Sequence, residues 1–459
     1  LEGRIKGLNQ LRAQLESLPK ESRSKAVVDA QVEGLATPTD HMLKIQLTKP
    51  FPQLLHFLAQ PYFSAVASEF IVPFADARGE VQDRPVGTGP FQLRRWKRGK
   101  LVELERNRAY HTEFYPMTAS EVHRAQGFLA DSGKPLPFLD GAVFEVVRDR
   151  LAGWDAFLAR KIDAIQIPRE RIGTTVIQEV NLSPELTSNG IRLVVEPTLS
   201  FYYLAFNLLD PVLGKNRALR QAFSEALDHP HWILTFTGGA GRAMNTVLGP
   251  GVLDSASRLS GNQSAPGARL KTVAELLAKA GHPGGKGLPP FQLDMRGSDE
   301  FNHEFAERYA KDLAQVGVRL AVTYNSFEDY LEKAKAGKLQ ISYGGWALDY
   351  PDPVNGLQLL YGPNHAPGPN EANFNSPEFN RLHEQLKFMD PGPARKNVVR
   401  RMEEIVIQEV PWALGYVPYD YRVHHPWVFN FRPLDLYPRA LKYFRFDPWI
   451  RLRYTEARP

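Results

Sequence analysis

The stretch GGWALDYPDP, residues 344–353, gathers the side chains with the most evident chemistry in this sequence. Carboxylates hold cations or exchange protons, aromatic rings stack on flat groups, and glycine lets another backbone approach closely. Asp352 and Pro353 precede an apolar run, which is the pattern of a helix N-cap followed by proline at the first helical position. Asp349 has no such structural duty. Two interpretations stay open for it: a counter-ion for a ligand cation, or a hydrogen bond to nearby backbone.

Three further residues of this stretch allow two interpretations each. Trp346 either stacks on a ligand or fills the core, and Gly344 and Gly345 indicate close approach by a ligand or by a neighbouring strand. Acid–base catalysis by Asp349 and Asp352 is disfavoured, because catalytic carboxyl pairs face each other across a cleft with separated pKa values. We therefore predict no catalytic residue here.

The remaining motifs indicate structure and not chemistry. GHPGGKG from Gly281 and GGAGR from Gly238 follow helical patterns and lack the spacing of nucleotide-binding loops, so both are interpreted as turns after helices. The histidines of DHPHW (228–232) and HHP (424–426) lack metal-ligand spacing on one helix face and are interpreted as loop or edge residues. No metal site and no cofactor is predicted.

The elements that must position residues 344–353 form a β–α–β–α–β pattern. They are expected in this order: strand 291–295, a helix with Phe305, Tyr309, Leu313 and Val316 on one face, strand 318–324, helix 326–336 and strand 339–343. Such a run predicts a parallel sheet, and ligands of open α/β sheets bind beyond the carboxyl ends of the strands. Because the stretch begins where the last strand ends, we expect it at the ligand-facing edge.

Other regions show simpler patterns. Residues 201–208 are predicted as a strand and residues 215–233 as one amphipathic helix, since apolar residues recur there at spacings of three and four. Further strands are predicted at 91–96, 101–107 and 141–147.

The composition is that of a soluble globular protein. The chain has 459 residues, 43% of them hydrophobic and 23% charged, and at this length we expect two or three domains. The 56 basic and 51 acidic residues are interspersed, so a nucleic-acid partner is not expected. The absence of cysteine excludes disulfides and thiolate chemistry. No apolar run approaches the roughly 18 residues of a membrane span.

Five segments together resemble a known family, the extracellular solute-binding proteins of family 5 from ABC importers, of the peptide- and nickel-binding type. They follow the family's order and cover roughly residues 35 to 430: VGTGPFQLRRWKRGKLVELERNRAYH (86–111), YYLAFNLLDPVLGKNRALRQAFSEALDH (202–229), VAELLAKAGHPGGKGLPPFQLDM (273–295), GGWALDYPDPVNGLQLLY (344–361) and MEEIVIQEVPWALGYVP (402–418).

The resemblance implies a type II periplasmic-binding-protein fold, α/β in class, with two lobes joined by hinge crossings. It implies that residues 1–85 are the end of an extra domain inserted in lobe I and that 86–200 belong to lobe I. Residues 201–430 would form lobe II, and 431–459 would return to lobe I. It also implies that the N-terminal part of lobe I, upstream of Leu1, is missing from this chain.

In peptide-binding members of the family, the aspartate of a W-x-x-D segment pairs with the free α-amino group of the ligand. The resemblance transfers this role to Asp349 alone. It places Trp346 beside the amine and the backbone of Gly345 and Ala347 along the peptide, with Tyr350 as a further ligand contact.

The function implied is that of a monomeric binding component that captures short peptides and delivers them to ABC permease subunits. It would be periplasmic or extracellular, either free or lipid-anchored, and not an enzyme. Two alternatives are a binding protein for a non-peptide solute (an oligosaccharide, an opine or a nickel chelate) and, in another class, a carboxylate-dependent hydrolase. The lack of a second well-placed acid disfavours the hydrolase.

Overall fold

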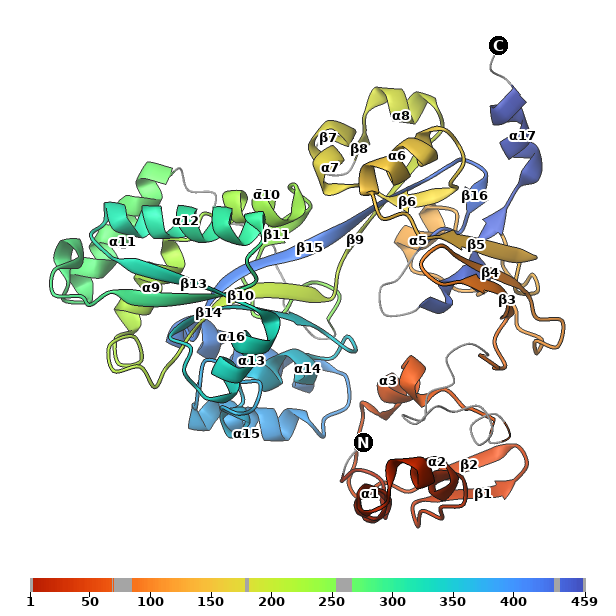
Figure 1. Cartoon of the computed structure of the whole chain (residues 1–459), viewed down its shortest axis with the longest axis horizontal. Coiled ribbons are helices and arrows are strands. Elements are labelled where there is room, and N and C mark those ends of the chain that lie inside the picture. The colour runs from red at the N-terminus through yellow and green to blue at the C-terminus, as the bar shows by residue number, and fades with distance from the viewer. Residues whose placement is uncertain are drawn as a thin grey trace. The chain divides into compact units, whose positions relative to one another are not determined.

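The computed structural model describes residues 3–67, 69, 85–177, 181–252, 266–432 and 438–456. The chain forms two compact units and passes between them twice: unit 1 comprises residues 1–164 and 424–459, and unit 2 comprises residues 165–423. Each unit is α/β, as the resemblance implies (Figure 1). The predicted division into four segments stays a prediction, and parts of segments 1–85 and 431–459 lie outside the described residues.

Unit 2 is built on a mixed sheet in the order β11-β15-β10-β14-β12-β13, and β6 and β9 also pair with β15. Its strands are β6 (Ala164–Gln166), β7 (Val176–Ile177), β8 (Asn181–Leu182), β9 (Arg192–Pro197), β10 (Ser200–Phe206), β11 (Gly241–Ala243), β12 (Phe291–Arg296), β13 (Leu320–Asn325), β14 (Ile341–Ala347) and β15 (Trp412–His424). Its helices are α7 (Arg169–Thr175), α8 (Pro184–Ser188), α9 (Arg217–Glu225), α10 (His229–Thr237), α11 (Pro266–Lys279), η2 (Pro283–Gly285), α12 (Glu300–Gln315), α13 (Phe327–Lys335), α14 (Pro353–Leu357), η3 (Gln358–Leu360), η4 (Gly362–Asn364), α15 (Pro377–Leu386) and α16 (Pro393–Glu409).

The predicted β–α–β–α–β pattern is confirmed. β12 pairs in parallel with β13 and with β14, and α12 and α13 connect them in sequence. β10 adds to β14 in antiparallel orientation, which makes the sheet mixed. The carboxyl ends of β12, β13 and β14 therefore meet at one edge.

Helices cover both faces of this sheet, and the alternating side chains of β10 contact both layers. Leu204 and Phe206 belong to a buried cluster with α9, α10, α11 and α12, whereas Phe201, Tyr203 and Ala205 belong to a second cluster with α14, α15 and α16 (Figure 1). Alternate residues of a strand point to opposite faces, so a run that is apolar throughout indicates a strand buried on both sides.

The helix predicted over residues 215–233 is in fact two helices, α9 and α10. Asp228 caps α10 by accepting from the backbone N–H of His231, and Pro230 lies in the first turn, where it needs no amide hydrogen. The amphipathic pattern continued across this break because both helices bury one face in the same cluster. The two predicted turns after helices are confirmed: Gly238 ends α10 in the left-handed region, and Gly281 follows α11.

A buried arginine ties α9 to the end of α16. The guanidinium of Arg220 donates to four backbone carbonyl oxygens, those of Leu213, Gly214, Glu409 and Val410, at 2.6–3.0 Å. Two of these carbonyls lie at the C-terminus of α16. The last carbonyl oxygens of a helix have no N–H partner within the helix, and Arg220 supplies the donors here.

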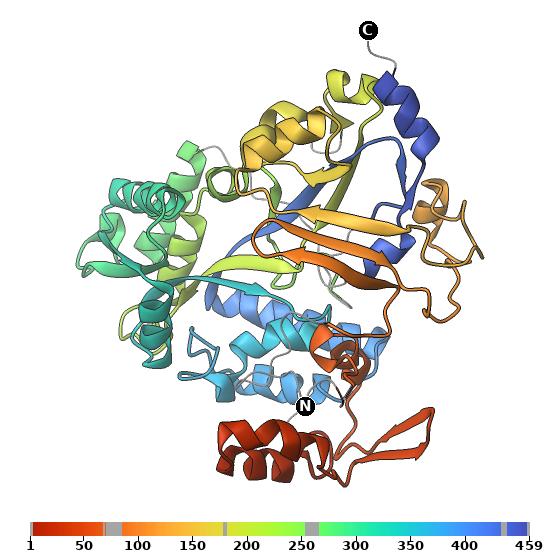
Figure 2. The same ribbon diagram turned by 45° about the vertical axis from the view of Figure 1, so that its right-hand side comes forward.

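Unit 1 contains smaller sheets. Its elements are α1 (Leu8–Ser17), α2 (Lys20–Val28), β1 (Leu35–Thr39), β2 (Met42–Ile45), α3 (Leu54–Leu58), η1 (Pro61–Phe63), β3 (Phe91–Lys97), β4 (Leu101–Arg106), α5 (Glu121–Ala125), β5 (Gly141–Glu145), α6 (Arg150–Leu158), β16 (Val428–Phe429), η5 (Pro438–Tyr443), β17 (Arg445–Phe446) and α17 (Pro448–Glu456). β1 pairs with β2, β16 pairs with β17, and β3, β4 and β5 form a three-stranded antiparallel sheet (Figure 2).

Of the histidines interpreted as loop or edge residues, His425 lies in the loop after β15, as predicted, and His424 is the last residue of that strand, whereas His229 and His231 lie in the first turn of α10, so the interpretation was wrong for them. Both His424 and His425 are buried. The ring of His425 lies between those of Phe157 and Trp427, with centroids at 4.3 and 4.2 Å, and its Nε2 donates to the carbonyl oxygen of Phe157. Burial lowers the pKa of His425. Sequence spacing excluded a metal site but could not reveal this packing.

Candidate functional site

The predicted site lies where β14 extends beyond its parallel neighbour. Gly345, Trp346 and Ala347 pair with Tyr202, Phe201 and Ser200 of β10 on one side. On the other side, the ladder with β12 ends at Ser342, and no other strand of the described chain pairs with that edge. The last residues of β14 therefore present one set of backbone groups that is not used by the sheet.

The two glycines make room for tyrosines of β10. A Cβ at Gly344 would lie 2.4 Å from the ring of Tyr203, and one at Gly345 would lie 2.7 Å from the ring of Tyr202. Tyr203 in turn stacks on Trp412, with ring centroids 3.9 Å apart. Of the two interpretations left open for these glycines, the structure favours approach by a neighbouring strand. Cross-strand aromatic packing over glycine accounts for both.

Asp349 lies two residues past the end of β14, and its side chain is exposed. The Nδ2 of Asn355 donates to Oδ2 of Asp349 at 3.2 Å, and Oδ1 of Asn355 accepts from the Asp349 backbone N–H at 3.3 Å. The indole Nε1 of Trp346 donates to the same Oδ1 at 2.9 Å. One amide side chain therefore links the carboxylate to the tryptophan.

The other predicted site residues differ in exposure. Ala347 is exposed, Gly345 and Trp346 are partly buried, and Tyr350 is buried with 6% of its surface accessible. Trp346 packs against the second hydrophobic cluster, so it has the core contacts that one of its interpretations required. The backbone of Gly345 and Ala347 and the carboxylate of Asp349 are thus the groups of this set that a ligand could reach.

Asp352 has the structural role predicted from its sequence. Its side chain accepts from the backbone N–H of Val354 at 2.9 Å, and Pro353 opens α14. The structure adds a partner from α16: Nη2 of Arg395 lies 2.7 Å from both carboxylate oxygens of Asp352, and the Arg395 side chain is fully buried. This ion pair fixes the start of α14, the helix that carries Asn355.

A second charged group lies near the same sheet edge. Arg296 is the last residue of β12, and its guanidinium lies over the ring of Tyr330 at 4.9 Å and 3.8 Å from Glu371. Tyr330 and Ser342 donate to the Glu371 carboxylate at 2.8 and 3.1 Å. Burial raises the pKa of Glu371, and the bonds from Tyr330 and the charge of Arg296 oppose that shift.

Sequence reasoning missed Asn355 and Arg395. Asn355 is three residues after the cap, inside a short helix, where an asparagine has no local role and a long-range contact is the simplest explanation. Arg395 is 43 residues from Asp352, and only the unusual position of an arginine in the first turn of α16 hinted at a buried carboxylate partner.

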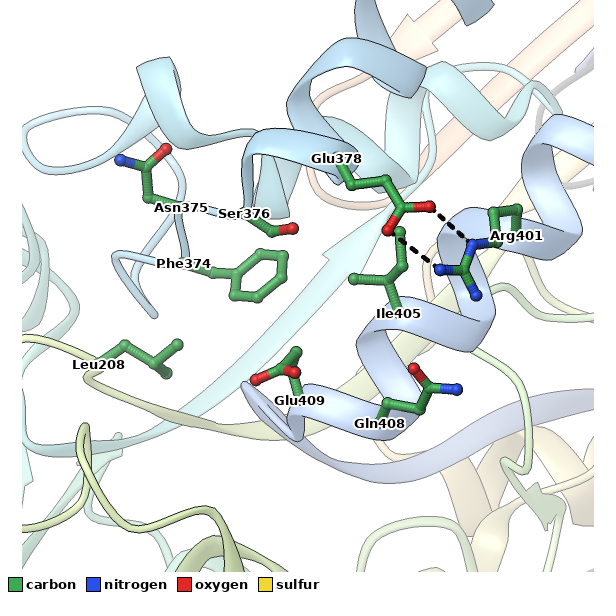
Figure 3. A pocket seen from close by; sticks show the side chains of 9 residues that line it. All are labelled: Leu208, Phe374, Asn375, Ser376, Glu378, Arg401, Ile405, Gln408 and Glu409. Atoms are coloured by element: carbon green, nitrogen blue, oxygen red, sulfur yellow. Dashed lines mark hydrogen bonds and ion pairs between the residues drawn. The ribbon is translucent and has the colours of Figure 1, made fainter.

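A separate hollow of about 340 Å³ lies away from these residues. It opens beyond the end of β10 that is farthest from Ala347, since Leu208 lines it and Ser200 pairs with Ala347 (Figure 3). Its lining residues are Leu208, Phe374, Asn375, Ser376, Glu378, Arg401, Ile405, Gln408 and Glu409. Glu378 and Arg401 form a two-bond ion pair at 2.8 and 3.0 Å, so these charges already satisfy each other. No predicted site residue lines it.

Two other kinds of feature are absent from the described residues. No group of three or more histidine, aspartate or glutamate side chains in these ranges could hold a metal ion. None of the described helices is both long and apolar enough to cross a membrane.

Comparison with known proteins places the chain in a family. The family model described as "Bacterial extracellular solute-binding proteins, family 5 Middle" matches residues 8–368. Heme-binding protein A of Haemophilus influenzae is 25% identical over 397 residues, which cover 84% of this chain and 65% of that protein. Oligopeptide-binding protein OppA of Bacillus subtilis is 23% identical over 384 residues, covering 82% and 64%.

Solved structures share the fold. HbpA2 from Haemophilus parasuis superposes with a TM-score of 0.72 at 20% identity, covering 90% of this chain and 75% of that structure. DppA from Helicobacter pylori, in complex with the peptide STSA, superposes with a TM-score of 0.64 at 18% identity, covering 95% and 79%. These are periplasmic binding proteins with the type II fold, so the predicted fold class is confirmed.

The chain spans about two thirds of the length of the curated relatives it matches. The family model nevertheless matches more than half of the residues of this chain. The matched range includes β10, β12, β14 and α14. The chain therefore belongs to the bacterial extracellular solute-binding proteins of family 5.

Proposed function

We propose that this protein is the binding component of an ABC importer and that its ligands are short peptides. The observation that carries the peptide assignment is the position of Asp349: an exposed carboxylate directly beyond an open-edged strand. Family membership supports the general role, and the relatives named as oligopeptide- and dipeptide-binding proteins support the class of ligand.

The chemistry of a peptide fits these groups. An α-ammonium that leaves water needs a charge partner, and a carboxylate held by Asn355 supplies one through charge-assisted hydrogen bonds. The backbone of Gly345 and Ala347 can pair with an extended peptide in the manner of an added strand. Such pairing depends on main-chain groups, so it tolerates many side chains.

Trp346 and Tyr350 have different roles in this proposal. Trp346 positions the site, because its indole shares the Oδ1 of Asn355 with the Asp349 backbone. Tyr350 is buried and supports the turn between β14 and α14. Direct ligand contact is assigned to Asp349, Gly345 and Ala347.

The test distinguishes Asp349, which would bind the peptide amine, from Asn355, which would hold the Asp349 carboxylate in place. We expect Asp349→Asn to weaken binding of trialanine strongly, and Asn355→Ala to weaken it less, because the carboxylate remains but is no longer held. Unchanged affinity in Asn355→Ala would refute the positioning role.

A second candidate ligand is a non-peptide solute, favoured by the relative named heme-binding protein A. A heme has carboxylates and no amine, so its binding would survive Asp349→Asn, whereas peptide binding would not. Native mass spectrometry of the purified protein would show which class of ligand co-purifies.

The remaining parts of the proposal concern the cell. The protein would deliver its ligand to a membrane permease, act as a monomer, catalyse no reaction and bind no nucleic acid. It would lie in the periplasm or outside the cell, free or lipid-anchored. Turnover of a bound peptide, seen as cleavage products, would contradict the assignment as a binding protein.

A further inference from the structure

The small sheet of unit 1 carries most of the excess positive charge of the chain. Residues 91–106 and 141–150, which contain β3, β4, β5 and the residues directly after β5, hold eight basic and four acidic residues, an excess of four. The excess over all 459 residues is five. In the rest of the chain the two signs nearly cancel, so this charge is a local feature of one sheet.

The register of the strands gathers many of these cations at one end of the sheet. Lys97 pairs with Leu101 across the turn between β3 and β4, and Leu101 pairs with Glu145, the last residue of β5. The backbone N–H of Val146 donates to the carbonyl oxygen of Lys100 at 2.9 Å, so the chain leaves β5 beside that turn. We call this end of the sheet the basic turn; its exposed cations are Lys97, Arg98, Lys100, Arg148 and Arg150.

Little carboxylate charge is available to the basic turn. Lys97, Lys100 and Arg148 form no ion pair with any residue that the structure describes. Asp149 follows Arg148 directly, but its carboxylate caps α6 by accepting from the backbone N–H of Leu151 at 2.9 Å. The positive charge of this end is therefore directed at solvent.

Neighbouring residues of β3 extend the positive surface. Arg94 and Arg95 both contact the carboxylate of Glu103, at 3.3 and 2.8 Å, so two guanidinium groups share one negative charge. Trp96 is 42% exposed, and the guanidinium of Arg98 lies 5.2 Å from the centre of its ring. An exposed tryptophan among cations is typical of surfaces that lie at a membrane–water interface.

The form of the basic turn favours an extended anionic surface over a single bound anion. A specific site for one phosphate or carboxylate needs donors that are held in place, such as a paired arginine fork or converging backbone N–H groups. Lys97, Lys100 and Arg148 have no carboxylate partner among the described residues to fix their directions. A lipid bilayer needs only the charge, because its headgroups can move laterally to meet mobile cations.

We propose that the basic turn docks on the anionic headgroups of a phospholipid bilayer. The attraction is electrostatic and reversible, since cations at a turn hold a protein at a bilayer surface without inserting it. The proposal goes beyond the proposed function, because it concerns where the protein waits and not what it binds. A binding component that delivers its ligand at a membrane would gain from being concentrated at that membrane.

An acidic polypeptide is a less well supported partner. Protein interfaces are usually anchored by a few side chains that are buried in matching pockets. The basic turn offers exposed charges on a turn and on the residues after a strand. Its complementarity to a partner is therefore one of charge and not of shape.

The first experiment measures how the purified 459-residue chain partitions onto sucrose-loaded vesicles in a sedimentation assay. Each basic residue near an anionic bilayer strengthens binding about fivefold. We expect the partition coefficient for phosphatidylcholine vesicles that contain phosphatidylglycerol to exceed that for pure phosphatidylcholine by at least about 100-fold. Raising the salt from about 0.1 M to about 1 M shortens the Debye length from about 10 Å to about 3 Å and should remove most of this difference.

The second experiment removes the charge. The variant Lys97→Gln, Lys100→Gln, Arg148→Gln lacks three cations of the basic turn and gains no negative charge. We expect its partition coefficient for the anionic vesicles to fall by at least about 30-fold. Its urea midpoint should not change, since these exposed side chains make no ion pair with the described residues, and this measurement shows that the variant still folds.

A matched control and a map locate the contact. The control Lys271→Gln, Lys311→Gln, Lys338→Gln removes the same net charge from exposed positions of unit 2 and should lower partitioning by less than about threefold. Hydrogen exchange in the presence of anionic vesicles should slow at residues 97–100 and 146–150 and stay unchanged in α11 and α12.

Several results would overturn the proposal. Equal partitioning onto anionic and neutral vesicles, or equal losses in the two triple variants, would show that the basic turn is not the contact. Vesicle-induced protection confined to other segments would show the same. Binding to poly-glutamate without binding to anionic vesicles would assign the basic turn to an acidic polypeptide. None of these readouts involves Asp349 or an added peptide, so failure here leaves the proposed function to its own test.

Discussion

The buried pair of Asp352 and Arg395 supports the turn that carries the candidate site, and removing its charges should be costly. The Arg395 side chain is fully buried, and Nη2 contacts both carboxylate oxygens at 2.7 Å. Breaking a buried ion pair on one side costs about 3–5 kcal/mol, because it leaves the other charge without its partner. We therefore expect Asp352→Asn and Arg395→Met each to destabilise unit 2 by about 3–5 kcal/mol.

The helix cap can be separated from the ion pair. Asp352→Asn keeps an oxygen that can accept from the Val354 N–H, whereas Asp352→Ala loses it. An N-cap contributes about 0.5–2 kcal/mol, so the alanine variant should be less stable than the asparagine variant by about that amount. The double variant Asp352→Asn, Arg395→Met removes both charges of the pair, and its loss should be clearly smaller than the sum of the two single losses.

The assay is urea unfolding, monitored by hydrogen exchange in peptides from β10 and β14. These peptides report on unit 2 alone. With a urea slope of about 3 kcal/mol/M, the single variants should lower the midpoint by about 1–1.7 M. Arg401→Met, which breaks the exposed pair with Glu378, is the matched control and should change the midpoint little. Additive losses in the double variant, or single losses no larger than the control, would refute this account.

Three further predictions concern side-chain packing, the pH dependence of stability and the hydrogen bonding of backbone carbonyl oxygens in unit 2. Gly344→Ala should destabilise by about 1–3 kcal/mol in urea unfolding, because its Cβ would lie 2.4 Å from a buried tyrosine ring; Gly173→Ala, with open space at its Cβ, should not. Burial lowers the pKa of His383 to about 4. Between about pH 4 and 6.5 this histidine is therefore protonated in the unfolded chain and neutral in the folded one, so the free energy of unfolding should rise with pH across that window. The full contribution, on the order of 3 kcal/mol, should be present above pH 6.5, and a His383→Phe variant measured from pH 4 to 8 should lose this dependence. Arg220→Met should cost about 3–5 kcal/mol, since four backbone carbonyl oxygens lose their donor, whereas Arg217→Met, an exposed control, should have little effect on the urea midpoint.

Part of this structure could be predicted from short stretches of the sequence. The cap at Asp352 and the parallel arrangement around β12 follow from short-range chemistry and from periodicity, and both are confirmed. The exposure of Asp349 fits both of its interpretations, and the structure adds bonds from its backbone N–H and to its carboxylate, both with the side chain of Asn355.

Other features depend on residues far apart in the chain. Nothing in the sequence near Asp352 reveals Arg395, and nothing near Gly344 reveals the tyrosine of β10 that fills its space. The break between α9 and α10 was missed because apolar spacing continued through it. The burial of His425 was missed because its packing against Phe157 joins residues 268 positions apart.

The central claim is that Asp349 binds the free amine of a peptide. The most direct measurement is calorimetric titration of the chain and of its Asp349→Asn variant with trialanine and with N-acetyl-trialanine, with Asp390→Asn, another exposed carboxylate, as control. We predict that trialanine binding weakens by about 30-fold or more in Asp349→Asn, which corresponds to at least about 2 kcal/mol. N-Acetyl-trialanine should bind the original chain as weakly as trialanine binds the variant, and the substitution should not weaken it further. Equal affinity for the two peptides in the original chain, or equal losses for both in the variant, would contradict the claim.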